Sequence, residues 1–187
     1  IVEKVKRAVE QGDDLSQIIN DALIAAMDIV GQKFATHEIY VPEMLVSALT
    51  MKRGMEVVKP LLTGEKTESR GTILIGTVKG DLHDIGKNLV IMMWEGAGFH
   101  VVDLGVDLSV ETVVQKVEEI RPQILGLSAL LTTTMPEMKH VIEMLEQKGL
   151  RKTVKILVGG APLDAAFAKK IGADGYGKDA AEAVRLA

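Results

Sequence analysis

The sequence predicts an α + α/β protein in which a helical bundle precedes a doubly wound parallel sheet. In the first third of the chain, apolar residues recur at helical spacing. Beyond about residue 70, short β-rich runs alternate with amphipathic segments instead. Between the two patterns, residues 62–70 are polar, contain a glycine and carry no apolar periodicity. We therefore expect a helical domain over residues 1–61, a linker over 62–70 and an α/β domain over 71–187.

Two helices are expected in the N-terminal region. Their apolar stripes comprise Leu15, Ile18, Ile19, Ala22, Leu23, Ala26, Ile29 and Val30 in the first helix, and Met44, Leu45, Ala48, Met51, Met55 and Val58 in the second. Asp13 or Asp14 can cap the first helix, and Pro42 suits the first turn of the second. Because the methionines keep helical spacing, we interpret them as core residues rather than as a soft metal site.

The second pattern predicts five strands and five helices in alternation. The strands are expected at 72–78, 101–104, 124–127, 154–158 and near Asp174, and the helices at 85–97, 109–120, 135–148, 163–171 and from Asp179. Nearly continuous apolar strands separated by helices indicate a parallel sheet covered on both faces. Right-handed crossovers then give a flavodoxin-like (Rossmann-like) fold. Ligands of such sheets bind at the carboxyl ends of the strands, so we expect the site in the loops after the first, third and fourth strands.

Composition excludes several classes of function. Of the 187 residues, 47% are hydrophobic and 26% charged, which is typical of a chain with a packed core. The net charge is −4, aromatic residues make up 3%, and Lys and Arg form no run, all of which argue against nucleic acid. No apolar stretch approaches the roughly 20 residues of a membrane helix. The absence of Cys excludes thiolate metal sites and thiol nucleophiles. We expect a cytoplasmic protein.

The loop after the first strand contains a histidine between two acids, His83 between Asp81 and Asp84, followed by Gly86 where a helix begins. It is not a phosphate loop, because five residues rather than four separate Gly80 from Gly86 and no hydroxyl follows the lysine. A carboxylate two residues away can fix the tautomer and basicity of a metal-binding imidazole. The alternative is an ordinary loop histidine that caps the following helix.

The other two loops are rich in hydroxyls and glycine. After the third strand come Ser128, Thr132, Thr133 and Thr134 among small and apolar residues, which suits a large amphipathic ligand. The alternative is that the threonines only satisfy backbone groups at the strand end. The fourth strand ends in Gly159, Gly160 and Ala161, where a bulky ligand can approach the backbone.

Together these residues resemble a known family. Asp81-x-His83-x-x-Gly86, Ser128-x-Leu130 and Gly159-Gly160 are similar to the signature of domains that bind cobalamin with its own benzimidazole displaced. Residues 28–34 and 38–44 resemble the helical cap of the methyl-transferring branch. The chain looks most like the corrinoid proteins that serve methylamine, methanol, methoxyaromatic or betaine methyltransferases, and is similar to the cap and cobalamin modules of cobalamin-dependent methionine synthase.

The resemblance implies a role for each matched residue. His83 would be the lower axial ligand of cobalt, Asp81 would hold its far nitrogen, and Thr134 would extend that relay. Further contacts to the cofactor would come from Leu82, Asp84, Ile85, Gly86, Ser128, Leu130, Thr132, Thr133, Gly159, Gly160, Ala161 and Ala180. Phe34 and Val41 would shield the methyl group from the cap side; the alternative is that they belong only to the core of the helical bundle.

The function that the resemblance implies is that of a corrinoid methyl carrier rather than a stand-alone enzyme. One substrate-specific methyltransferase would methylate it, a second would pass the methyl group to a folate or a thiol, and a corrinoid reductive activator would be a further partner. Two alternatives share the loop signature: the cobalamin-binding subunit of an adenosylcobalamin-dependent mutase, and a cobalamin-sensing regulator. A response regulator is excluded, because the third strand ends in Ser128 rather than in an acceptor Asp.

Overall fold

The structure, a computed structural model, describes residues 1–61 and 69–187, apart from the side chains of Ser16, Ala35 and Lys59. These residues form two compact units. One comprises the N-terminal residues up to Arg70 together with 92–99, and the other comprises 71–91 and 100–187. The linker predicted over 62–70 falls mostly on residues 62–68, which lie outside the described residues.

The N-terminal unit is helical, as the apolar periodicity predicted. Its elements are α1 (Val2–Glu10), α2 (Leu15–Gln17), η1 (Ile18–Ile24), α3 (Ala25–Ala35), α4 (Val41–Val58) and η2 (Lys59–Leu61). Asp14 is the N-cap of α2, and its Oδ1 accepts a hydrogen bond of 3.0 Å from the backbone N–H of Gln17. Pro42 lies in the first turn of α4, as expected.

Two features of this unit were not predicted. Helix α1 was not expected, although Val5 is buried in the core and Ala8 and Val9 pack against it at helical spacing. η1 is a π-helix, with wider turns than the α-helices on either side of it. The core of the unit includes Met51, with Met55 packed against it, and Met44 is fully buried. The interpretation of these methionines as core residues is therefore confirmed.

The α/β unit contains one five-stranded parallel sheet in the order β2-β1-β3-β4-β5. Its strands are β1 (Thr72–Thr77), β2 (His100–Asp103), β3 (Ile124–Ser128), β4 (Lys155–Gly159) and β5 (Gly175–Gly177). Its helices are α5 (Ile85–Gly96), α6 (Val110–Ile120), α7 (Pro136–Gln147), η3 (Arg151–Thr153), α8 (Ala165–Ile171) and α9 (Ala180–Leu186). The last residues of α5 belong to the N-terminal unit. The doubly wound fold class is confirmed.

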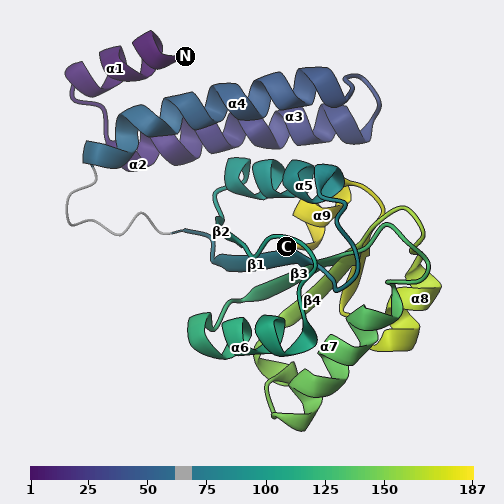
Figure 1. Ribbon diagram of the computed structural model, residues 1–187. Coiled ribbons are helices and arrows are strands. Elements are labelled where there is room, and N and C mark those ends of the chain that lie inside the picture. The colour runs from purple at the N-terminus through teal and green to yellow at the C-terminus, as the bar shows by residue number, and fades with distance from the viewer. Residues whose placement is uncertain (62–68) are drawn as a thin grey trace. The chain divides into compact units, whose positions relative to one another are not determined.

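Helices cover both faces of this sheet. α6, α7 and α8 lie on one face, and α9 lies on the opposite face with the first half of α5 (Figure 1). The central strands β1, β3 and β4 are almost entirely buried, and their side chains form one apolar core with α6 and α7. The connection from β1 leads toward one edge of the sheet and that from β3 toward the other. In open parallel sheets, ligands bind in a crevice at the carboxyl ends of the strands where the chain direction reverses in this way.

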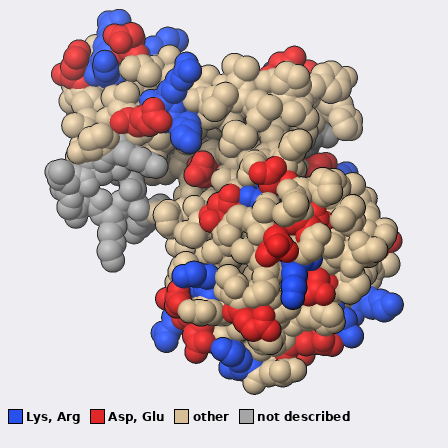
Figure 2. Space-filling model, in the orientation of Figure 1, with Lys and Arg blue, Asp and Glu red and all other residues tan. Residues whose placement is uncertain are grey.

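The surface of the α/β unit carries charges of both signs. Figure 2 shows acidic and basic side chains interspersed over the face in view. No helix within residues 1–61 and 69–187 combines the length and the apolar character needed to cross a membrane.

Candidate functional site

The three loops predicted to hold the site begin at the same level of the sheet. In the register of the parallel strands, Thr77 at the end of β1 pairs with Ser128 at the end of β3, and Ser128 pairs with Gly159 at the end of β4. The residues that follow these three positions therefore leave the sheet side by side, at its carboxyl edge.

The loop after β1 folds tightly around the carboxylate of Asp81. Oδ1 of Asp81 lies 2.7 Å from Nδ1 of His83 and accepts a 3.0 Å hydrogen bond from the backbone N–H of the same residue. Thr77, which is fully buried, donates its hydroxyl to the backbone carbonyl of His83 at 3.0 Å. The side chain and both backbone groups of His83 are therefore fixed by two neighbours.

The second oxygen of the same carboxylate reaches the loop after β3. Oδ2 of Asp81 accepts hydrogen bonds from the backbone N–H groups of Leu130 at 2.7 Å and Leu131 at 3.2 Å, and from the hydroxyl of Thr134 at 2.8 Å. Asp81 is fully buried, and Thr134 is only 6% exposed. One carboxylate thus joins the two loops on either side of the crevice.

These contacts keep Asp81 ionised despite its burial. Burial by itself would raise the pKa of the carboxyl, but the hydrogen bonds from Leu130, His83 and Thr134 outweigh it and hold the pKa well below its usual range. An ionised carboxylate beside Nδ1 favours the neutral tautomer whose proton is on Nδ1, and in that tautomer Nε2 has the lone pair. The His83 side chain is 52% exposed, so this site offers solvent an imidazole with a free acceptor nitrogen.

Large apolar side chains are exposed on the two loops that meet at Asp81. Leu82 and Ile85 are 71% and 86% exposed, and Leu130 and Leu131 are 42% and 40% exposed. Such residues in two adjacent loops form an apolar surface of the kind that binds a ligand. Leu131 was not among the predicted site residues, although both its N–H and its side chain belong to this edge.

The glycines after β4 allow backbones to approach closely. Gly160 has φ of +137°, and a Cβ at this position would lie 1.8 Å from the carbonyl oxygen of Ala129. A Cβ at Gly159 would lie 3.2 Å from the carbonyl oxygen of Gly177. A Cβ at Gly86 would meet nothing within 4 Å. Gly160 is thus required by the fold and Gly159 is tightly packed, whereas a side chain at Gly86 would meet open space.

The remaining predicted residues differ in accessibility. Ser128 is half-buried, while Thr132, Thr133, Asp84 and Ala161 are exposed on the loops of this edge. Ala180, expected to contact a ligand, is only 4% exposed in the first turn of α9, so its side chain packs inside the unit. Phe34 is half-buried and Val41 exposed, and both lie in the N-terminal unit, where their shielding role stays a prediction.

Thr77 is a further site residue that the sequence did not reveal. Threonine is a common residue in strands, so its presence at the end of a buried strand does not by itself indicate a site. Its hydroxyl contact with His83 depends on how the next six residues turn back toward the strand. The one available signal was a hydroxyl at the carboxyl end of β1, the edge at which ligands bind.

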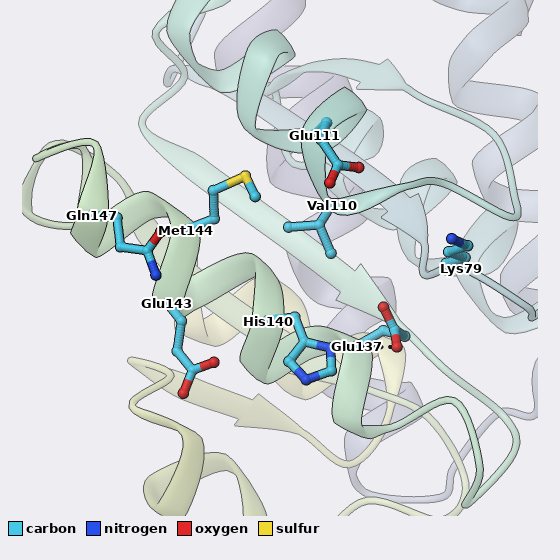
Figure 3. A pocket seen from close by; sticks show the side chains of 8 residues that line it. All are labelled: Lys79, Val110, Glu111, Glu137, His140, Glu143, Met144 and Gln147. Carbon is cyan, nitrogen blue, oxygen red and sulfur yellow. Dashed lines mark ion pairs between the residues drawn. The ribbon is translucent and has the colours of Figure 1, made fainter.

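A separate hollow of about 350 Å³ lies between the first turn of α6 and the exposed side of α7 (Figure 3). It is lined by Lys79, Val110, Glu111, Glu137, His140, Glu143, Met144 and Gln147. Nδ1 of His140 lies 3.3 Å from a carboxylate oxygen of Glu137, one turn away on the same helix. None of the predicted site residues lines this hollow.

Comparisons with known proteins agree over both units. The family described as B12 binding domain matches residues 71–185, and a second family of the same description matches residues 1–59. A corrinoid protein of Desulfitobacterium hafniense is 40% identical, over 100% of this chain and 88% of the relative. The trimethylamine corrinoid protein of Methanosarcina barkeri is 44% identical, over 97% of this chain and 85% of the relative.

A solved structure gives the same result. The methanol:cobalamin methyltransferase complex MtaBC of Methanosarcina barkeri contains a chain that matches with a TM-score of 0.88 and 34% identity, over 98% of this chain and 70% of that chain. These relatives do not favour the two alternatives considered from the sequence, a mutase subunit and a cobalamin-sensing regulator.

Proposed function

This chain belongs to the corrinoid proteins with B12-binding domains, and we propose that it carries a methyl group between two methyltransferases. Cobalamin is its cofactor. Bound cobalamin supplies a cobalt centre that can accept a methyl group from one molecule and give it to another. The chain's own residues would hold that centre and supply a ligand to its cobalt.

The residues at the carboxyl edge of the sheet fit such a group. His83 offers one free nitrogen, and the described residues include no cluster of three or more His, Asp or Glu side chains that could hold a metal ion by itself. A single imidazole suits a metal whose other ligands come from a macrocycle. The exposed apolar side chains of Leu82, Ile85 and Leu130 suit the macrocycle's broad apolar surface.

The observation that carries this proposal is the Asp81 carboxylate. It fixes the tautomer of His83 through one oxygen and ties the loop after β3 to the same point through the other. We assign His83 as the lower axial ligand of cobalt and Asp81 as the group that orients it. Thr134, whose hydroxyl lies 2.8 Å from Asp81, extends the hydrogen-bonded relay. Ser128, Thr132 and the segment Gly159–Ala161 are assigned to the displaced nucleotide tail.

The relatives support a set of partners. The solved complex pairs a corrinoid chain with a methyltransferase, and one relative is named a trimethylamine corrinoid protein. We propose two methyltransferase partners. One is specific for a small methylated compound and transfers its methyl group to this chain, and the second passes the methyl group to a folate or a thiol. A reductive activator of the corrinoid completes the set, and all of these exchanges are placed in the cytoplasm.

The axial assignment can be tested by electron paramagnetic resonance of the protein loaded with cobalamin and reduced to Co(II). Wild-type protein should show splitting from one axial nitrogen, and this splitting should change when histidine is labelled with ¹⁵N. His83→Gln should lose the response to the label. The control is His140→Gln, which removes the other exposed histidine that lies beside a carboxylate, and it should behave as wild type.

Methyl transfer needs its own measurement. Reduced, loaded protein should take up a radiolabelled methyl group from methyl iodide and release it to a thiol when a thiol-specific methyltransferase is added. Failure to retain any corrinoid, or retention with the cofactor's own benzimidazole still bound to cobalt, would contradict the proposal.

A further inference from the structure

The loop between β2 and α6, residues 104–109, lies directly against the loop that carries Asp81 and His83. Beyond the end of β1, Val78 and Leu108 still form a parallel bridge. The backbone N–H of Thr77 donates to Gly105 at 3.0 Å, and that of Leu108 donates to the carbonyl of Thr77 at 3.1 Å. The β2–α6 loop thus continues the pairing of β1 and β2 up to the residues that precede the site.

Asp107 makes the contacts closest to the site. Its Oδ1 accepts a 2.7 Å hydrogen bond from the backbone N–H of Gly80, and its own backbone N–H donates to the carbonyl of Asp81 at 3.0 Å. One residue therefore holds the peptide group that follows Asp81 and the peptide group between Lys79 and Gly80. No predicted site residue lies in this loop, and Asp107 itself touches neither His83 nor Thr134 in any contact described above.

The backbone conformation of Asp107 supports a specific role. Its φ is +55°, a left-handed conformation that costs free energy for a residue with a side chain. Among the other residues with this conformation, Arg121 lies at the C-cap of α6, where left-handed residues are common. Asp107 ends no helix. In its conformation the backbone N–H and the carboxylate both face the Gly80–Asp81 segment, which offsets the cost.

The start of the same loop is anchored independently. Nζ of Lys87, in the first turn of α5, lies 2.6 Å and 2.7 Å from the two carboxylate oxygens of Asp103, and the Lys87 side chain is 1% exposed. Oδ1 of Asp103 also accepts from the backbone N–H of Gly105 at 2.9 Å. The β2–α6 loop is therefore attached to the helix that follows His83 as well as to the turn that precedes it.

From this arrangement we infer that Asp107 is a positioning residue for the His83–Asp81 pair. By fixing the N–H of Gly80 and the carbonyl of Asp81, it sets the direction in which the carboxylate points and, through it, the direction of the His83 ring. It acts through Asp81. The assignment of His83 as an axial ligand rests on the proposed function, whereas the placement of the Asp81 turn by Asp107 can be measured without cofactor.

The first test uses protein free of cofactor. Asp107→Gly keeps the left-handed backbone and its N–H but removes the carboxylate. Loss of one hydrogen bond to Gly80 should speed hydrogen exchange of the Gly80 amide roughly tenfold. The ¹⁵N signals of the His83 ring should also move toward a mixture of tautomers. Asp107→Asn keeps an oxygen acceptor and tolerates the left-handed conformation, so it should preserve both signals.

The matched control is Arg121→Gly, which relieves a left-handed residue of similar φ at the end of α6 without touching the site. It should leave the Gly80 exchange rate and the His83 ring signals as in wild type. If Asp107→Gly leaves both signals unchanged, or if Arg121→Gly changes them equally, the inference is overturned.

The second test uses protein loaded with cobalamin and reduced to Co(II). Asp107→Gly should lower the fraction with an axial histidine nitrogen at least severalfold, with Asp107→Asn near wild type. If wild-type protein shows no axial histidine, the proposed function fails, and the cofactor-free measurements still decide the role of Asp107. If wild type shows it and Asp107→Gly retains the full fraction, the positioning role is wrong.

Discussion

His83 and His140, both in the α/β unit, each lie beside a carboxylate, but the two pairs differ in their surroundings. His83 and His140 are almost equally exposed, at 52% and 53% of their side chains. The carboxylate beside His83 is completely buried and 2.7 Å away, whereas Glu137 is 27% exposed and lies 3.3 Å from His140 on the same helix. Five hydrogen-bond contacts fix Asp81, and they come from two loops that are about 50 residues apart in sequence.

This comparison shows that proximity of an acid to an imidazole does not by itself make a ligand site. A carboxylate on a helix surface can turn toward solvent, so it fixes neither the ring nor its tautomer. A buried carboxylate that backbone N–H groups hold in place does both, because none of its partners can rotate away. The predictions below test how much of the difference comes from these partners.

The largest effect is expected from Asp81→Asn. An amide keeps only one acceptor oxygen, and its NH2 group would face donors on the other side. Either the donors of Leu130, Leu131 and Thr134 or the backbone N–H of His83 would therefore lose their acceptor. We expect a loss of about 3 kcal/mol in the free energy of unfolding, measured by urea denaturation of the protein without cofactor. The matched change at the other pair, Glu137→Gln, should stay within about 0.5 kcal/mol. Equal effects at the two positions would remove the distinction between the pairs.

An effect of intermediate size is expected when the free energy of unfolding is measured as a function of pH. Because the pKa of Asp81 is lower in the folded protein than its ordinary value of 3.8, the ionised carboxylate stabilises the fold at every pH above that value. The stabilisation is lost as the pH falls below it toward the folded-state pKa. The advantage of wild type over Asp81→Asn in urea unfolding should therefore be constant from pH 7 to about pH 5 and shrink below about pH 4. An advantage that already declines between pH 7 and pH 5 would show that Asp81 is not held in its ionised form.

The smallest effect is expected from Thr134→Val. This change removes one donor to Asp81 and keeps the volume of the side chain, while the N–H groups of Leu130 and Leu131 remain in place. The free energy of unfolding should fall by about 1 kcal/mol, with the His83 ring signals in nuclear magnetic resonance largely unchanged. Thr134→Ser, which restores the hydroxyl, should recover most of the loss. A loss as large as that of Asp81→Asn would mean that Thr134 rather than the backbone holds the carboxylate.

Much of the fold was readable from local patterns. The strands and helices after residue 70 follow from apolar runs, and Asp14, Ser109 and Asp179 act as N-caps at the positions where helices were expected to begin. The Asp81–His83 pair was predictable because its two residues lie close together in sequence. The carboxyl edge of the sheet was predictable because parallel strands bring their ends together.

What could not be predicted depends on contacts between distant segments. The N–H groups of Leu130 and Leu131 carry no signature in the sequence, although they hold Asp81. The role of Asp107 depends on a left-handed backbone that its side chain does not require. Ala180 is buried in the first turn of α9, and its contact with a ligand stays a prediction. Each of these features could be predicted only once the register of the sheet was known.

Gly160 and Gly86 also differ in how strongly folding alone constrains the residue at each position. At Gly160 the backbone of Ala129 occupies the place of any side chain, so selection for folding alone suffices to keep that position invariant. Gly86 faces empty space, so a folded but unloaded protein gives selection little reason to preserve it. Lineages that abandon the cofactor would therefore be expected to drift first at residue 86 and to retain residue 160 long after the chemistry has gone.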